Sequence, residues 1–259
     1  MNEDINRRFA GIARLYGAHG LNALQNAHIT VVGVGGVGSW AVEALARSGV
    51  GKLTLIDLDN IAPSNVNRQL IALTPDFGKA KVTALRERIA LINPACQVIE
   101  IEEFVDEDNL STLFAKPMDF VIDAIDQVRI KAAMANYFVR NKQAFIMSGG
   151  AGGQRNPALI QSCDLSQTKQ DALLANVRHR LRKHYGFAKN GNKMRVPCIF
   201  SSEPITPPQT QETCEHSGSL NAPQGLSCAG YGASMLVTAS FGLHCATAAI
   251  EHIMKRAKP

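Results

Sequence analysis

The sequence predicts a doubly wound α/β fold with a mainly parallel sheet. Strand-like and helix-like segments alternate through the first half of the chain, as expected for parallel strands joined by helical crossovers. A glycine-rich turn, GVGGVG at residues 33–38, separates the first strand-like segment from the first helical one. An acidic residue, Asp57, closes the second strand-like segment. Together these features are typical of a sheet that binds a nucleotide at the carboxyl ends of its strands.

The elements of the first half follow from the local hydrophobic pattern. Apolar runs rich in β-branched residues predict strands, and apolar residues three and four positions apart predict helices. Strands are expected at residues 28–32, 52–57, 98–101, 120–124 and 144–147. Helices are expected at residues 37–47, 79–92, 107–114 and 128–141, and Asn93-Pro94 ends the second of them.

The pattern changes after a second glycine-rich stretch at residues 149–153. Strands are expected at residues 158–161 and 198–201, helices at 171–185 and 233–255, and a long polar loop at 203–224. A loop of that length in a compact enzyme is often functional. We therefore expect a single domain over residues 1–259, with a nucleotide-binding half at 1–153 and a substrate-binding half at 154–259.

The composition is that of an ordinary globular enzyme. The chain has 259 residues, of which 46% are hydrophobic and 19% charged, and a formal net charge of +5. Six cysteines are scattered without a CxxC pair, so we expect reduced thiols in the cytoplasm, not a disulfide framework. The amino terminus is polar and has no apolar run, so no signal peptide is expected.

One stretch near the carboxyl terminus requires a choice between two structures. Residues 226–250 contain no Lys, Arg, Asp or Glu, and the length suits a bilayer. The stretch carries many small and hydroxyl-bearing residues, whereas a membrane span is normally more apolar. We expect a helix buried within the protein, no integral membrane span, and at most peripheral contact with a membrane.

The glycine-rich turn predicts a phosphate-binding loop. Its glycines, Gly33, Gly35, Gly36 and Gly38, let the backbone turn tightly and approach a phosphate at the positive end of the following helix. At the end of the next strand, the Asp57 carboxylate is placed to accept hydrogen bonds from ribose hydroxyls. The alternative is a glycine cluster that serves packing alone.

Polar and basic residues beyond the second strand indicate which nucleotide binds. The candidate nucleotide-binding side chains there are Asp59, Ser64, Asn65, Asn67, Arg68 and Lys81. A dinucleotide dehydrogenase does not need such a cluster, whereas a triphosphate does, because charge on its phosphates must be neutralised as pyrophosphate leaves. The alternative for Arg68 and Lys81 is that both are solvated surface charges.

These motifs resemble one family. GVGGVG, LIDLD, SNVNRQ, GKAKV, INP and DAID are similar to the motifs of the ubiquitin-activating-like adenylating enzymes, which have a Rossmann-like fold. The resemblance covers roughly residues 8–153. It implies ATP and Mg²⁺ as cofactors, a homodimer, and attack of a carboxylate on the α-phosphate to give an acyl-adenylate.

The resemblance also implies roles for individual residues. Gly36 would lie against the nucleotide, Asp57 would hold the ribose, and Asn65, Arg68 and Lys81 would contact the phosphates. Asp126 would hold the magnesium ion, since hard carboxylate oxygens suit that cation. Gln127, the next residue, stands where many relatives have Asn.

Two departures from the family pattern matter. Relatives often carry an amino-terminal arginine that reaches into the partner's site, and here Arg8 and Arg14 both compete for that role. Activators of sulfur-carrier proteins commonly bind zinc through two CxxC pairs, and this sequence has none, so no structural zinc is expected.

The second half resembles one subgroup, the tRNA threonylcarbamoyladenosine dehydratases. The resemblance rests on GGAGGQRNP, the basic helix that follows, and LSCAGYGAS before the final helix. It implies a tRNA-bound threonylcarbamoyl carboxylate as substrate and leaves open a sulfur-transfer protein as a partner. On the predicted helix, apolar residues form one face, so Arg178, Arg182 and Lys183 are expected to point outward and contact tRNA, unless they form a plain solvated face.

The sequence leaves alternatives for the chemistry and for the function. Cys228 is a candidate acyl acceptor. Direct attack by the adjacent carbamoyl group would need no thioester. For Cys228 itself we favour the alternative of a buried structural thiol, since free cysteine is often buried. The alternative functions are an adenylyltransferase for a sulfur-carrier protein, an NAD-dependent oxidoreductase, and a binding module without catalytic activity.

Overall fold

The computed structural model describes residues 3–189, 191–208 and 231–257. Seven strands form one sheet in the order β3-β2-β1-β4-β5-β7-β6. Every neighbouring pair is parallel except β6 and β7. The strands are β1 (His28–Val32), β2 (Lys52–Ile56), β3 (Gln97–Ile101), β4 (Phe120–Asp123), β5 (Phe145–Ser148), β6 (Ile160–Asp164) and β7 (Pro197–Ser201). The predicted fold class is confirmed.

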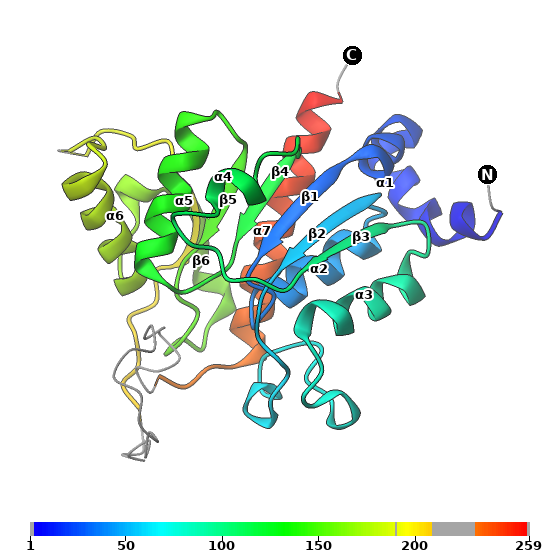
Figure 1. Cartoon of the computed structure of the whole chain (residues 1–259), viewed down its shortest axis with the longest axis horizontal. Helices are drawn as coiled ribbons and strands as arrows, with labels where there is room; N and C mark the ends of the chain where they lie inside the picture. Colours follow the sequence, from blue (N-terminus) through cyan, green and yellow to red (C-terminus); the bar gives the residue numbers. More distant parts are fainter. Residues whose placement is uncertain (1–2, 190, 209–230, 258–259) are drawn as a thin grey trace.

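Helices cover both faces of this sheet (Figure 1). Side chains of α1, α2, α3 and α7 pack in one hydrophobic cluster, and those of α4, α5 and α6 pack in a second one. The α-helices are α1 (Glu3–Asn26), α2 (Gly38–Arg47), α3 (Lys81–Ile92), α4 (Leu110–Leu113), α5 (Val128–Arg140), α6 (Ala172–His184) and α7 (Met235–Arg256). Short 3₁₀ turns are η1 (Pro63–Asn65), η2 (Thr74–Asp76), η3 (Pro157–Leu159) and η4 (Leu165–Gln167).

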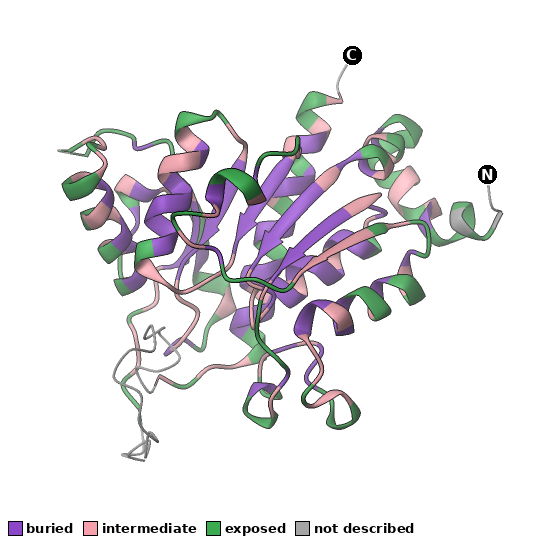
Figure 2. Ribbon diagram, viewed as in Figure 1, coloured by how far each residue is buried: buried purple, intermediate pink, exposed green. Residues whose placement is uncertain are grey.

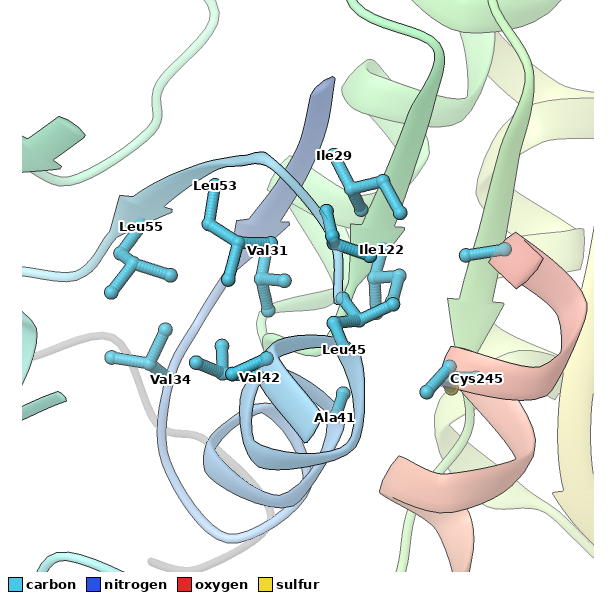
Figure 3. Close-up of a cluster of buried hydrophobic side chains, with 14 of the residues drawn as sticks. Ile29, Val31, Val34, Ala41, Val42, Leu45, Leu53, Leu55, Ile122 and Cys245 are labelled. Atoms are coloured by element: carbon cyan, nitrogen blue, oxygen red, sulfur yellow. The ribbon is translucent and has the colours of Figure 1, made fainter. Parts of the chain in front are cut away.

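The inner strands β1, β2, β4, β5 and β7 are almost wholly buried (Figure 2), because apolar side chains leave them in both directions. Successive residues of a strand point to opposite faces of a sheet. Val121 of β4 accordingly belongs to the cluster under α5, whereas the next residue, Ile122, belongs to the cluster under α2 and α7. Figure 3 shows Ile122 together with Leu45 of α2 and Cys245 of α7 in the cluster on that face of the sheet.

The predictions differ from the structure mainly at the ends of the chain and at short elements. Helix α1 was not predicted, because its glycines and exposed polar residues mask the helical pattern, and Gly17 (φ 77°) breaks its geometry. Helix α4 is only Leu110–Leu113, shorter than the predicted helix over residues 107–114. Strand β6 begins at Ile160 because Pro157–Leu159 forms a 3₁₀ turn. Residues 209–224 of the predicted loop lie outside the described residues.

The prediction of a buried final helix is confirmed. Val237, Phe241, Cys245 and Ala249 of α7 are buried, and the helix packs mainly on α2. The hydroxyls of Ser240 and Thr247 donate to the carbonyls of Leu236 and Leu243, one turn earlier in the same helix. In the part of the chain that the structure describes, no helix is long and apolar enough to cross a membrane. One face of α7 stays exposed at Leu236 and Leu243.

The α2–α7 contact gives a stability prediction. A Cβ at Gly242 of α7 would collide with the carbonyl oxygen of Val37 and lie 2.9 Å from Trp40 Cβ. We expect Gly242→Ala to lower the free energy of unfolding by roughly 1–3 kcal/mol, the usual cost of overpacking. Gly11→Ala is the matched control, because a Cβ at that helical glycine meets nothing within 4 Å. The control should be neutral or stabilising in urea denaturation, since alanine favours a helix. Equal midpoints for both variants would contradict the packing argument.

Candidate functional site

The candidate site is a cavity at the carboxyl edge of the sheet, at the point where the order of strands reverses. From β1 the chain builds the sheet outward through β2 and β3, and from β4 it builds outward in the other direction. Neighbouring loops therefore diverge at the carboxyl ends of β1 and β4, which is where α/β sheets bind ligands. A cavity of about 510 Å³ opens there, and the residues that follow β1, β2, β3, β4 and β5 line it.

The glycine-rich turn forms one wall of this cavity. Gly33, Gly35 and Gly36 line the cavity, as predicted for a nucleotide loop. Gly33 has a φ of +79°, and a Cβ there would lie 2.8 Å from Ile125 Cγ2 in the loop after β4. Gly38 does not line the cavity, because it packs against the carbonyl oxygen of Gly33 and closes the turn from within. The loop thus has three glycines facing the cavity and one that fixes its shape.

Asp57 connects this turn to the end of β2. One carboxylate oxygen accepts a hydrogen bond from the backbone N–H of Val34 (2.8 Å), and the other accepts from the N–H of Asp59 (2.9 Å). Burial raises the pKa of Asp57, and the opposing influences are the charge of Lys81 and these two N–H groups. Asp57 therefore orders the glycine-rich turn while it faces the cavity.

Lys81, the first residue of α3, is buried, so the alternative of a solvated surface charge is wrong for this residue. Its Nζ lies 2.7 Å from Asp59 Oδ2 and 4.0 Å from Asp57 Oδ1. All three side chains line the cavity. The predicted contact of Lys81 with a phosphate would require Nζ to share or leave its ion pair with Asp59.

Arg68 is the cavity's other cation. Its Nη1 donates to the carbonyl oxygen of Ser64 (2.8 Å) and to Asn67 Oδ1 (3.0 Å). Its own carbonyl oxygen accepts from Trp40 Nε1 (2.9 Å). Among the described residues, no carboxylate lies within the 4.0 Å of a salt bridge to Arg68, so its charge is available for an anion in the cavity.

The neighbours of Arg68 divide into two groups. Asn65 is buried and lines the cavity, with its side-chain oxygen accepting from Ala62 N–H at 3.0 Å. Ser64 and Asn67 do not line the cavity, although we predicted both as nucleotide-binding. They hold Arg68 in place, and Asn67 Nδ2 also donates to the Ala233 carbonyl before α7 (2.8 Å). Both residues therefore support Arg68 from outside the cavity lining, and their contact with a nucleotide stays a prediction.

Asp126 and Gln127 form the wall after β4. Among the described residues, the Asp126 carboxylate has no hydrogen-bond or salt-bridge partner. No group of three or more His, Cys, Asp or Glu side chains in the described ranges could hold a metal ion. One free carboxylate suits Mg²⁺ that arrives with ATP, because this ion commonly takes one or two protein carboxylates and completes its shell with phosphates and water.

Several lining residues were not predicted. They are Gln69, Glu103, Phe104, Val105, Gly149, Gly150, Ala151, Gly152, Leu173, Tyr231, Ala233 and Thr238. The glycine-rich stretch at residues 149–153 was visible as a signal, but the sequence did not place it at the cavity. Gln69 adjoins the predicted Arg68 and is buried, and within the described ranges its Oε1 has no hydrogen-bond partner. Leu173 and Thr238 were missed because they lie in the first turns of α6 and α7.

The first turns of α2, α3, α5, α6 and α7 all reach this cavity, since residues at or just before each of these helix starts line it. The amino-terminal end of a helix carries partial positive charge and unpaired N–H groups, which favour anions. Arg68 and Lys81 add full charges. The arrangement therefore suits a polyanion such as a triphosphate.

The two arginines that compete for the partner's site differ in their contacts. Arg8 pairs with Asp4 (2.7 Å) and donates to the carbonyls of Leu91 and Ile92 at the end of α3. Arg14 is exposed and makes no hydrogen bond or salt bridge to any described residue. Neither lines the cavity of its own chain. Cys228, the candidate acyl acceptor, lies outside the described residues.

Arg178 and Arg182, which were expected to point outward from the basic helix and contact tRNA, are half-buried and bind neighbouring loops. Arg178 Nη1 donates to the carbonyls of Leu165 and Thr168 and to Thr168 Oγ1, and Arg182 Nε donates to the Ala188 carbonyl. Both guanidinium groups therefore hold the loops that flank α6. Lys183 is exposed as predicted. The other exposed basic side chains nearby are Lys169, Lys189, Lys193 and Arg195.

The chain is similar in sequence and in fold to known proteins over nearly its whole length. The tRNA threonylcarbamoyladenosine dehydratase of Haemophilus influenzae is 46% identical over 255 residues, which cover 98% of this chain and 96% of that protein. The crystal structure of the E. coli tRNA N6-threonylcarbamoyladenosine dehydratase in complex with ATP superposes with a TM-score of 0.89 at 43% identity, over 99% of this chain and 97% of that one.

The likeness to an adenylyltransferase of molybdopterin synthase is more limited. The Salmonella typhimurium protein is 36% identical over 120 residues, which cover 46% of this chain and 48% of that protein. The model of the ThiF family matches residues 6–259. The chain therefore belongs to the ThiF family.

Proposed function

We propose that the protein uses ATP to dehydrate the threonylcarbamoyl group of N6-threonylcarbamoyladenosine in tRNA, through an acyl-adenylate. The observation that carries the proposal is the cavity at the carboxyl edge of the sheet, where helix amino termini, Arg68, Lys81 and the carboxylate of Asp126 line the same space. The near full-length likeness to dehydratases supports the choice of substrate over the sulfur-carrier alternative.

The chemistry has two steps. The threonyl carboxylate attacks the α-phosphate of ATP, and pyrophosphate leaves. The carbamoyl group then attacks the activated carbonyl carbon, loses a proton and expels AMP, so the net change is loss of water from the substrate at the expense of ATP. Ring closure within one molecule is favoured by proximity. Arg68 would neutralise the departing phosphates, and backbone N–H groups of the glycine-rich turn would orient them.

Mg²⁺ is part of the proposal. When bound with ATP, it neutralises charge on the phosphates. Asp126 would hold the ion, and Gln127 would support it at the start of α5.

A homodimer is also proposed, in which Arg14 reaches the partner's cavity. Thr238 of α7 lies at the cavity, whereas Met254 of α7 contacts Gly20 of α1. At a rise of 1.5 Å per helical residue, these contacts are about 24 Å apart. Helix α1 therefore lies far from the cavity of its own chain (Figure 1). Exposed Leu15 and Tyr16 beside Arg14 would be covered in such a dimer.

The four described cysteines are free thiols, which suits a reducing cytoplasm.

The first test of the proposal is ATP–pyrophosphate exchange. We expect label to pass from pyrophosphate into ATP when tRNA bearing threonylcarbamoyladenosine is present, because adenylation of its carboxylate is reversible. Unmodified tRNA and a sulfur-carrier protein ending in glycine serve as controls and should not stimulate exchange. Exchange with the carrier protein alone would favour the adenylyltransferase alternative.

The second test concerns Arg68. We expect Arg68→Ala to weaken ATP binding roughly 10- to 100-fold and AMP binding much less, because a hydrogen bond to a charged group contributes about 1.5–3 kcal/mol and AMP lacks the β- and γ-phosphates. Titration calorimetry measures both affinities. Arg86→Ala, which removes a surface partner of Glu100 outside the cavity, is the control and should change neither. An equal loss for ATP and AMP would refute the placement of Arg68 at the outer phosphates.

The third test concerns tRNA. Lys183 and Lys189 are exposed beside α6, so we expect the Lys183→Ala/Lys189→Ala variant to reduce the slope of log affinity against log salt by roughly 1.5, at somewhat less than one unit per lost phosphate contact. Lys116→Ala/Lys255→Ala removes two exposed lysines elsewhere and should leave the slope unchanged. Identical slopes for the two variants would show that the surface at α6 is only solvated.

A further inference from the structure

A lysine is buried directly behind the wall that carries Asp126. Lys131 lies at the end of the first turn of α5 and has a relative exposure of 0%, so it is among the largest fully buried side chains in the described part of the protein. It does not line the cavity. Its ammonium group is therefore not a ligand contact, and its burial requires another explanation.

The contacts of Lys131 all converge on the segment between β4 and α5. Its Nζ donates to Asp123 Oδ1 (2.9 Å), to the carbonyl oxygen of Ile125 (2.9 Å) and, at the limit of hydrogen bonding, to the carbonyl oxygen of Asp123 (3.5 Å). Asp123 Oδ1 also accepts from the N–H of Ile125 (3.3 Å). Lys131 and Asp123 thus hold residues 123–125, immediately before Asp126.

The same segment presses against the glycine-rich turn. A Cβ at Gly33 would lie 3.0 Å from the carbonyl carbon of Ala124 and closer still to the side chain of Ile125. Residues 124–127 and the turn at 33–36 are therefore adjacent walls of one cavity. A shift of the segment after β4 would move Asp126 relative to the phosphate loop.

The charge of Lys131 reaches a second wall as well. It acts to lower the pKa of Asp171, against the larger effect of burial, which raises it. Asp171 accepts hydrogen bonds from Leu174 N–H at the start of α6 (2.9 Å) and from Gly150 N–H in the cavity wall (3.0 Å). Lys131 thus pairs with the carboxylate behind the wall after β4, and its charge also favours the charged form of the carboxylate behind the wall after β5.

Stability alone does not account for this pair. Burying two charges costs more free energy than a similar apolar pair, and replacement of a buried ion pair by uncharged residues is often neutral or stabilising. The Lys131–Asp123 pair is also incompletely satisfied, since Asp123 Oδ2 has no hydrogen-bond partner among the residues that the structure describes. An apolar residue would suit the surrounding cluster of α5 better on energetic grounds.

We propose that Lys131 is a positioning residue, which fixes residues 123–126 so that the Asp126 carboxylate faces the phosphates of bound nucleotide. The inference rests on the proposed function, in which Asp126 holds Mg²⁺. Loss of a residue that orients a metal ligand usually weakens metal affinity roughly 10- to 100-fold, without removing the ligand itself. Lys131 would accordingly set how strongly Mg²⁺ enhances the binding of ATP.

The experiment measures this coupling by titration calorimetry, as the ratio of ATP affinities with and without Mg²⁺. We expect the ratio to be large in the unmodified protein and near one in Asp126→Ala. In Lys131→Met it should fall roughly 10-fold or more. Lys131→Arg keeps the charge and donors and should restore part of the ratio. Because Lys131→Met leaves Asp123 buried without its cation, the Asp123→Asn/Lys131→Met variant, which neutralises both partners, is measured beside it.

A matched variant separates positioning from loss of stability. Phe138→Leu removes core volume from the same helix, where Phe138 is fully buried in the cluster under α5. It should lower the midpoint of urea denaturation and leave the Mg²⁺ ratio unchanged. If the folded Asp123→Asn/Lys131→Met variant keeps the full ratio, or if Phe138→Leu loses it equally, the positioning role is overturned. If Asp126→Ala itself keeps the ratio, the proposed role of Asp126 fails instead.

Discussion

The carboxylate of Asp57 is the interaction on which the cavity depends. It joins three segments that are distant in the sequence: the end of β2, the glycine-rich turn through Val34 N–H, and the start of α3 through Lys81. Burial raises its pKa, and the charge of Lys81 and the N–H groups of Asp59 and Val34 act against that rise by favouring the charged form. A ribose that bound here would replace water around a carboxylate whose position is already fixed, which reduces the entropy lost on binding.

The parallel sheet explains why charge gathers at this edge. Each crossover returns the chain so that a helix begins beside the carboxyl end of a strand, and the positive ends of α2, α3, α5, α6 and α7 therefore meet at the cavity. Such a field would bind any polyanion. Two acids make the charge of the cavity uneven. Asp59 pairs with Lys81, whereas Asp126 has no partner among the described residues. This difference is what a site for a metal-bound triphosphate requires.

The sequence predicted those features that depend on local pattern. Strands of the parallel sheet appear as apolar runs, and Gly33 and Asp57 stand at fixed positions relative to them, so both were correctly placed at the cavity. Contacts between distant segments had no local signal. Arg178 looked like a surface charge because the carbonyls of Leu165 and Thr168 that bind it come from a separate turn. Likewise, Ser64 and Asn67 belong to a nucleotide-like motif, yet their position behind Arg68 follows from the approach of Ala233.

The cavity is chemically uneven, and this asymmetry bears on the substrate. Among the described residues, the charged side chains that line it come from residues 57–126: Asp57, Asp59, Arg68, Lys81, Glu103 and Asp126. The lining residues that the structure describes beyond position 148 are uncharged: Gly149, Gly150, Ala151, Gly152, Leu173, Tyr231, Ala233 and Thr238. A nucleotide would occupy the charged side, so the threonylcarbamoyl group would meet, among the described residues, an uncharged wall of glycine backbone and of the side chains of Leu173, Tyr231 and Thr238. Such a wall discriminates by shape and by backbone hydrogen bonds, which suits the neutral carbamoyl part of a substrate whose threonyl carboxylate points toward the nucleotide.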